Sequence, residues 1–180
     1  CMKASWVFCV CLPKQASASP ILSSEPKLAK PISTDSAAPD DSWQSMNMLL
    51  TEIDHIAIAV NDLEAAIDYY QRAFGAVVDH REVVESDGVE EALLKVAESY
   101  IQLLTPTRPD SPVAKAIEKR GEGLHHIGYR AADCAVALAS MIAAGATPID
   151  KAPRPGSRGT TVAFIHPKGS FGTLIELVQE

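Results

Sequence analysis

The chain has 180 residues and a formal net charge of −7, from 16 basic and 23 acidic residues. Charges of both signs are mixed along it, which argues against a nucleic-acid partner. The sequence has no apolar stretch long enough to cross a bilayer, so we expect no membrane partner. Three of its 4 cysteines lie in the first eleven residues. That placement gives no disulfide framework and suits a reducing compartment such as the cytoplasm.

Residues 1–47 differ in composition from the rest of the chain. They are rich in Ser, Pro, Ala and Lys and show no sustained hydrophobic period. This is typical of a segment that is disordered or not natively translated. A transit peptide would instead direct the protein to the mitochondrial matrix, but the segment contains no Arg and carries acidic residues. We expect the folded domain to comprise residues 48–180.

The hydrophobic pattern of the first part of this domain predicts one strand, one helix and then three strands. We predict a strand over 53–60, a helix over 62–74, and strands near 76–84, 89–97 and 99–105. Asn61 or Asp62 would cap the helix, and Gly75 would end it. The expected apolar stripe of the helix consists of Ala65, Ala66, Tyr69, Tyr70 and Ala73.

The second part repeats this order after a connector over 106–121. The connector carries a short helix over 112–120, capped by Asp110 or Ser111. The repeat consists of a strand over 124–131, a helix over 133–144, and strands near 147–151, 160–166 and 173–179, with a mobile-looking loop over 151–159. Each module, about 51–105 and about 122–180, therefore has the order βαβββ.

The two modules resemble each other in sequence as well as in order. His55 and His126 are 71 residues apart and both directly precede Ile in the first strand. Gln102 and Glu176 are 74 residues apart and lie in the last strand. This is the pattern of an internal duplication. It predicts an α+β fold in which two βαβββ modules pair curved mixed sheets around a shared cavity.

The duplicated polar positions indicate a metal site. In the first strand, His55 shares a face with small alanines, whereas Ile56 and Ile58 point to the face expected to pack on helices. A lone strand histidine is more often a hydrogen-bonded core residue than a ligand. However, Gln102 and Glu176 inside apolar strands are costly unless they are paired. One divalent metal would satisfy His55, Gln102, His126 and Glu176 together.

This ligand set narrows the choice of metal. Two imidazoles and two oxygens leave two positions open on an octahedral ion, which suits a chelating substrate with two oxygens. Co²⁺ is the first expectation, and Mn²⁺, Ni²⁺, Mg²⁺ and Zn²⁺ also fit. His125 competes with His126 for the ligand position, and the register of the repeat favours His126.

The sequence resembles the methylmalonyl-CoA epimerase family of the vicinal oxygen chelate superfamily. The pieces that carry the resemblance are 53–60, 88–92, 100–106, 110–112, 121–127, 164–169 and 174–177. The resemblance implies the same four metal ligands and a catalytic base at Glu91, which strand parity alone leaves open as a solvated edge glutamate. Gly169 departs from the family pattern, because relatives often have an acidic residue there.

The resemblance also implies the reaction. The protein would epimerise (2R)- and (2S)-methylmalonyl-CoA by removing the C2 proton, through a metal-chelated enolate, with Glu176 or an unidentified acid returning the proton. It would act as a homodimer. The alternatives are a glyoxalase I-type lyase, an extradiol dioxygenase, which Gln102 as a fourth ligand opposes, and a non-catalytic drug-binding protein. The last would need an aromatic-lined groove and no metal ligands, whereas aromatic residues make up only 6% of this chain and the four polar positions are filled.

Overall fold

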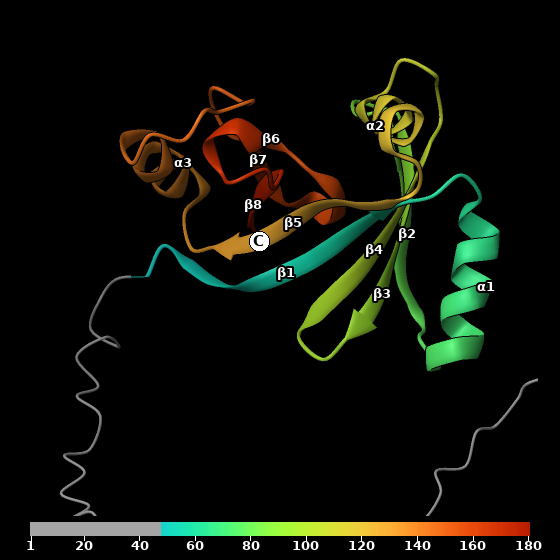
Figure 1. Ribbon diagram of the computed structural model, residues 1–180. Coiled ribbons are helices and arrows are strands. Elements are labelled where there is room, and N and C mark those ends of the chain that lie inside the picture. Colours follow the sequence, from blue (N-terminus) through green and yellow to red (C-terminus); the bar gives the residue numbers. More distant parts are fainter. Residues whose placement is uncertain (1–47) are drawn as a thin grey trace, which may run out of the picture. The chain divides into compact units, whose positions relative to one another are not determined.

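The structure is a computed structural model that describes residues 48–180 (Figure 1). The predictions for 1–47, a disordered or non-native extension or a transit peptide, lie outside the described residues. Among residues 48–180, no helix combines the length and the apolar composition needed to span a membrane.

The described residues form two successive βαβββ modules joined by a helix. The first module comprises β1 (Leu50–Ala59), α1 (Leu63–Phe74), β2 (Val78–Val84), β3 (Val89–Val96) and β4 (Ser99–Pro106). The helix α2 (Pro112–Arg120) follows. The second module comprises β5 (Gly123–Ala131), α3 (Cys134–Ala143), β6 (Arg154–Pro155), β7 (Thr161–Ile165) and β8 (Ile175–Gln179), with single turns η2 (Ser157–Gly159) and η3 (Pro167–Gly169).

The strands of both modules form one mixed sheet in the order β2-β3-β4-β1-β5-β8-β7-β6. Within each module the first strand pairs in parallel with the last, β1 with β4 and β5 with β8. The modules meet where β1 pairs antiparallel with β5, and these two strands run side by side through the centre of Figure 1. The predicted α+β fold of two paired modules, the vicinal oxygen chelate fold, is confirmed.

Helix α1 begins and ends where its capping residues predict, but its buried face differs from the expected stripe. Asp62 is the N-cap and accepts a hydrogen bond from Ala65 N, and Gly75 closes the helix at φ +66°. The buried side chains are Leu63 and Ile67, with Tyr70 half-buried. The prediction was wrong for Ala65, Tyr69 and Ala73, which are exposed. The i, i+3, i+4, i+7 series that packs on β3 and β4 starts at Leu63, because the larger aliphatics bury more apolar area there.

The strand predicted near 147–151 is not formed, and this prediction was wrong. The segment makes only an isolated bridge between Pro148 and Ile165. Pro148 has no N–H to donate to a ladder. The Asp150 carboxylate accepts the hydrogen bond from Phe164 N that a strand carbonyl would otherwise take. The short strand β6 forms instead inside the segment predicted as a loop and pairs with β7.

Helices cover both outer parts of the sheet but not all of its centre. Helix α1 packs on β3 and β4 through Leu94 and Leu103, and α3 packs on β7 and β8. Ile58 packs in the α1 cluster as expected, whereas Ile56 is 36% exposed, so the prediction that it packs on a helix was wrong. Helix α2 packs against Ala57, Ala59 and Leu104 through Val113, on the face that carries the polar strand residues, and so closes one end of that face.

The core beneath α1 should carry much of the folding stability. Leu103 is fully buried, so truncation to Ala leaves a cavity, and we expect Leu103→Ala to lower the free energy of unfolding by about 2–5 kcal/mol. Val136 is 51% exposed on α3, and Val136→Ala should change it by less than about 0.5 kcal/mol. Urea denaturation of both variants measures this, and equal effects would contradict the assignment of the core.

Candidate metal centre

The sheet register places His55 and Glu176 in one row across the junction of the modules. On β1, His55 lies opposite Gly128 of β5. Gly128 lies in turn opposite Glu176 of β8. Residues in one row of a sheet point to the same face, so these two side chains share a face with only a glycine between them.

The neighbouring row brings in the other two predicted ligands. Ala57 lies two residues beyond His55 on β1 and therefore points to the same face. It pairs with Gln102 of β4 on one side and with His126 of β5 on the other. The four residues that the sequence selected from two modules therefore come from four adjacent strands of one sheet face.

Three donor atoms meet at one point on this face. His55 Nε2 lies 3.0 Å from His126 Nε2 and 3.0 Å from Glu176 Oε2, and His126 Nε2 lies 2.9 Å from the same oxygen. All three side chains are buried. Neighbouring ligands of an octahedral ion with bonds of about 2.1 Å are separated by about 3 Å, so this spacing fits a divalent metal. The three residues form a group that could hold a metal ion.

The charges of these groups also favour the binding of a cation. Burial alone would raise the pKa of Glu176, but hydrogen bonds to His126 and His55 hold it well below its usual range. Burial lowers the pKa of His126. Burial would also lower the pKa of His55, yet hydrogen bonds to Asp54 and Glu176 raise it to about 9. Glu176 is therefore ionised, and the point where the donors meet favours positive charge, which a metal ion would supply in place of the His55 proton.

Gln102 fits the role of a fourth ligand through its carbonyl oxygen. Its amide nitrogen donates a 2.7 Å hydrogen bond to Glu91 Oε2. Its carbonyl oxygen is buried and has no hydrogen-bond partner among the described residues. A buried acceptor without a partner costs about 1–3 kcal/mol, and a metal bound by Gln102 would remove that cost.

Glu91 lies in the same cavity as the donor cluster, which consists of His55 Nε2, His126 Nε2 and Glu176 Oε2. Strand β3 points Glu91 inward, where it is 3% exposed, while its neighbour Glu90 points outward and bonds to Arg81. Burial raises the pKa of the Glu91 carboxyl against the opposing effect of the Ser157 hydroxyl, and the charges of Glu176 and Glu82 also raise it. Its Oε1 accepts no hydrogen bond from the described residues. Glu91 therefore offers a free carboxylate oxygen in a site of low polarity.

The cavity has a volume of about 180 Å³ and mainly apolar walls. Val84, Val89, Leu104, Val113, Val162 and Phe164 form these walls. Glu91, Gln102, His126 and Glu176 are among its polar lining residues, and Gly156 and Ser157 border it from the 151–159 segment. His125 also lines the cavity, and its Nδ1 lies 2.8 Å from Nδ1 of His126. Burial lowers the pKa of His125 to about 4.

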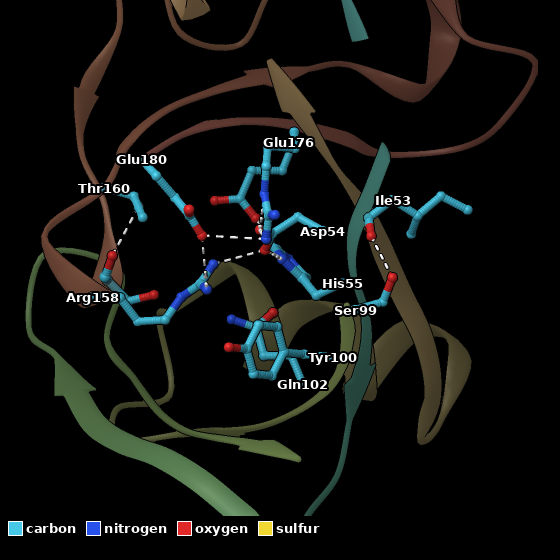
Figure 2. A network of polar contacts seen from close by, with 12 residues as sticks. Ile53, Asp54, His55, Ser99, Tyr100, Gln102, Arg158, Thr160, Glu176 and Glu180 are labelled. Carbon is cyan, nitrogen blue, oxygen red and sulfur yellow. Dashed lines mark hydrogen bonds and ion pairs between the residues drawn. The ribbon is translucent and has the colours of Figure 1, made fainter. Parts of the chain in front are cut away.

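Sequence reasoning missed two residues that shape the site. Gly128 leaves room for the His55 ring, because a Cβ at position 128 would lie 2.3 Å from His55 Cε1. Asp54 is fully buried, and its Oδ1 lies 2.8 Å from His55 Nδ1, on the ring side opposite the donor cluster (Figure 2). The sequence signals that could have indicated them were a glycine two residues after His126 and a carboxylate directly before His55.

The room at Gly128 gives a first test of the centre. We expect Gly128→Ala to weaken Co²⁺ binding by at least about tenfold, because the added methyl displaces the His55 ring from its position. Val136→Ala is the control, since Val136 is exposed on α3 and does not line the cavity. Titration of chelator-treated protein with Co²⁺ measures both, and unchanged affinity in Gly128→Ala would contradict the placement of His55.

The shifted pKa of His55 predicts how the metal-free protein responds to pH. A pKa raised from 6.5 to about 9 means that the folded state binds the proton more tightly than the unfolded state. This stabilisation is complete below the unfolded value and is lost as the pH rises through about 9. The urea midpoint of chelator-treated protein should therefore fall between about pH 7 and about pH 9.5, and His55→Gln should flatten this fall. Parallel pH curves for the two proteins would refute the assignment.

Comparisons with known proteins show what this chain is similar to. The family model described as Glyoxalase/Bleomycin resistance protein/Dioxygenase superfamily matches residues 54–164. The curated ethylmalonyl-CoA/methylmalonyl-CoA epimerase of Cereibacter sphaeroides is 36% identical over 133 residues, which cover 73% of this chain and 99% of the relative.

Solved structures of methylmalonyl-CoA epimerases are also similar to this chain. A Streptomyces coelicolor methylmalonyl-CoA epimerase variant in complex with 2-nitronate-propionyl-CoA superposes with a TM-score of 0.71 at 44% identity, covering 73% of this chain and 98% of that chain. A methylmalonyl-CoA epimerase in complex with methylmalonyl-CoA and NH₄⁺ gives the same TM-score and identity and covers 73% of this chain and 95% of its own. This chain belongs to the glyoxalase/bleomycin resistance protein/dioxygenase superfamily and, within it, to the methylmalonyl-CoA epimerase family.

Proposed function

We propose that the protein is a metal-dependent epimerase that interconverts (2R)- and (2S)-methylmalonyl-CoA. The observation that carries the proposal is the free, buried carboxylate oxygen of Glu91 beside a cluster of metal-ligand donors in one apolar cavity. The complex of a relative with methylmalonyl-CoA supports the choice of substrate.

The metal would be held by His55, Gln102, His126 and Glu176. A bound divalent ion, Co²⁺ in the first place and Mn²⁺, Ni²⁺, Mg²⁺ or Zn²⁺ as alternatives, supplies Lewis-acid stabilisation of negative charge on substrate oxygens. The orphaned oxygen of Gln102 and the ionised Glu176 support this ligand set.

Glu91 would act as the base that removes the C2 proton. That proton is acidic because it lies between a thioester and a carboxylate, and its removal leaves an enolate. Gln102 fixes the base by donating to Oε2, so that Oε1 remains free to accept the proton. The apolar part of the lining lowers the local polarity, which would strengthen the electrostatic interactions that stabilise the enolate.

Epimerisation also requires a proton donor on the opposite face of the enolate. The role of Glu176 as this acid stays a prediction. The lowered pKa of Glu176 keeps it ionised in the metal-free protein, so it carries no proton to donate near neutral pH, which favours its role as a ligand.

A homodimer is part of the proposal. Ile53, Ile56 and Leu124 are 43%, 36% and 57% exposed on the central strands β1 and β5, where helices leave part of the sheet uncovered. Exposed apolar side chains on adjacent strands support contact with a second copy.

Deuterium exchange at C2 of methylmalonyl-CoA tests the base. We expect chelator-treated protein to regain exchange with Co²⁺, and Glu91→Gln to reduce the rate by at least about a hundredfold because the amide cannot accept the proton. Glu90→Gln is the matched control, because the side chain of Glu90 points outward to Arg81 and should leave the rate unchanged.

The outcomes separate the candidate functions. Exchange that survives in Glu91→Gln would keep the epimerase and move the base to another group. No exchange with any of the metals would refute the epimerase. A glyoxalase I-type assay with a glutathione thiohemiacetal would then test the lyase alternative, and ligand binding without turnover would indicate the drug-binding alternative.

A further inference from the structure

Arg158 connects the segment that borders the cavity to the residue behind His55. It belongs to the single turn η2, next to Gly156 and Ser157, which line the cavity. Its guanidinium nitrogen Nη2 donates a 2.7 Å hydrogen bond to Asp54 Oδ1. The same Asp54 oxygen lies 2.8 Å from His55 Nδ1. Figure 2 shows Arg158 reaching from the turn to Asp54 and His55.

The turn is held at two further points. The backbone N–H of Arg158 donates a 3.0 Å hydrogen bond to Glu82 Oε2 of β2. The guanidinium lies over the Tyr100 ring, 5.0 Å from its centroid. Arg158 has φ +56°, a conformation that costs a non-glycine residue free energy and persists only where surrounding contacts fix it. The side chain is 14% exposed, so these contacts are largely shielded from water.

Charge neutralisation of Asp54 does not require Arg158. Arg130 donates to Asp54 Oδ2 through two nitrogens, at 2.9 and 3.2 Å. Arg130 belongs to β5 and not to the segment that borders the cavity. Arg158 is therefore the second cation on one buried carboxylate, and it differs from the first in binding the oxygen that faces His55 and in belonging to the cavity rim.

We propose that Arg158 is a positioning residue that links the cavity rim at 156–159 to the metal ligand His55 through Asp54. The carboxylate that accepts a hydrogen bond from the second ring nitrogen of a ligand histidine fixes the tautomer and the ring orientation. Arg158 fixes the direction of Asp54 Oδ1, so that His55 Nε2 stays directed at the donor cluster. Because such coupling is reciprocal, metal binding at His55 also stabilises the rim that borders the substrate cavity. This rests on the metal site of the proposed function but not on the epimerisation.

The test compares Arg158→Met and Arg158→Gly with Arg130→Met. Glycine adopts the positive φ without strain but removes the guanidinium, so it separates the side-chain contact from backbone strain. We expect both Arg158 variants to weaken Co²⁺ binding by about tenfold. In wild type, Co²⁺ should slow amide hydrogen exchange over residues 156–160. This metal-dependent protection should be lost in both Arg158 variants and kept in Arg130→Met, a difference that a purely structural role would not produce.

A metal-free readout keeps this proposal separate from the metal centre itself. The imidazole N–H signal of His55, followed by NMR in chelator-treated protein labelled with ¹⁵N-histidine, should be protected from solvent exchange in wild type and exchange faster in the Arg158 variants. If wild type binds no Co²⁺, the metal centre fails, and the His55 signal still decides the role of Arg158. An unchanged His55 signal in the Arg158 variants, or wild-type Co²⁺ affinity with intact metal-dependent protection, would overturn the proposal.

Discussion

The antiparallel pairing of β1 with β5 is the constraint on which the site depends. Neither module carries a complete set of ligands, because His55 and Gln102 belong to the first and His126 and Glu176 to the second. The register of this one strand pair decides whether the donor atoms meet. A shift of one residue would turn His55 or His126 to the opposite face of the sheet. The absence of a side chain at Gly128 belongs to the same constraint, because the row that joins His55 to Glu176 passes through it.

The site concentrates ionisable groups in a place that would otherwise be apolar. Asp54, Glu91 and Glu176 are all buried, yet their surroundings do not shift their pKa values in the same direction. Arginines and His55 lower the pKa of Asp54 to about 2 against the effect of burial. Burial raises the pKa of Glu91, whose Oε1 accepts no hydrogen bond from the described residues. This contrast separates their roles, since an anion held by cations serves as a fixed support, whereas a carboxylate with a free oxygen can accept a proton.

The sequence alone predicted the features that follow from repetition and alternation. The duplication indicated which residues would share a face, and capping residues such as Asp62 located the helix starts. The features that it missed depend on contacts between segments distant in sequence. The contact of Arg158 with Asp54 joins residues separated by 104 positions, and no local pattern encodes it. The error near Pro148 has a different cause, because the Asp150 carboxylate accepts the hydrogen bond from Phe164 N, and the segment forms only an isolated bridge to β7. The expected stripe of α1 began at Ala65 and left out Leu63 and Ile67, which are the buried residues of the helix.

The most direct test of the account is an anomalous diffraction map from crystals grown with Co²⁺. The account predicts one cobalt peak per described domain, bound by His55 Nε2, His126 Nε2, the Glu176 carboxylate and the Gln102 amide oxygen. The described residues contain a second group of possible ligands, His80, Glu82 and Glu91. A cobalt peak at that group and none at the first would contradict the account, because the ion would then occupy the proposed base instead of the substrate-binding centre.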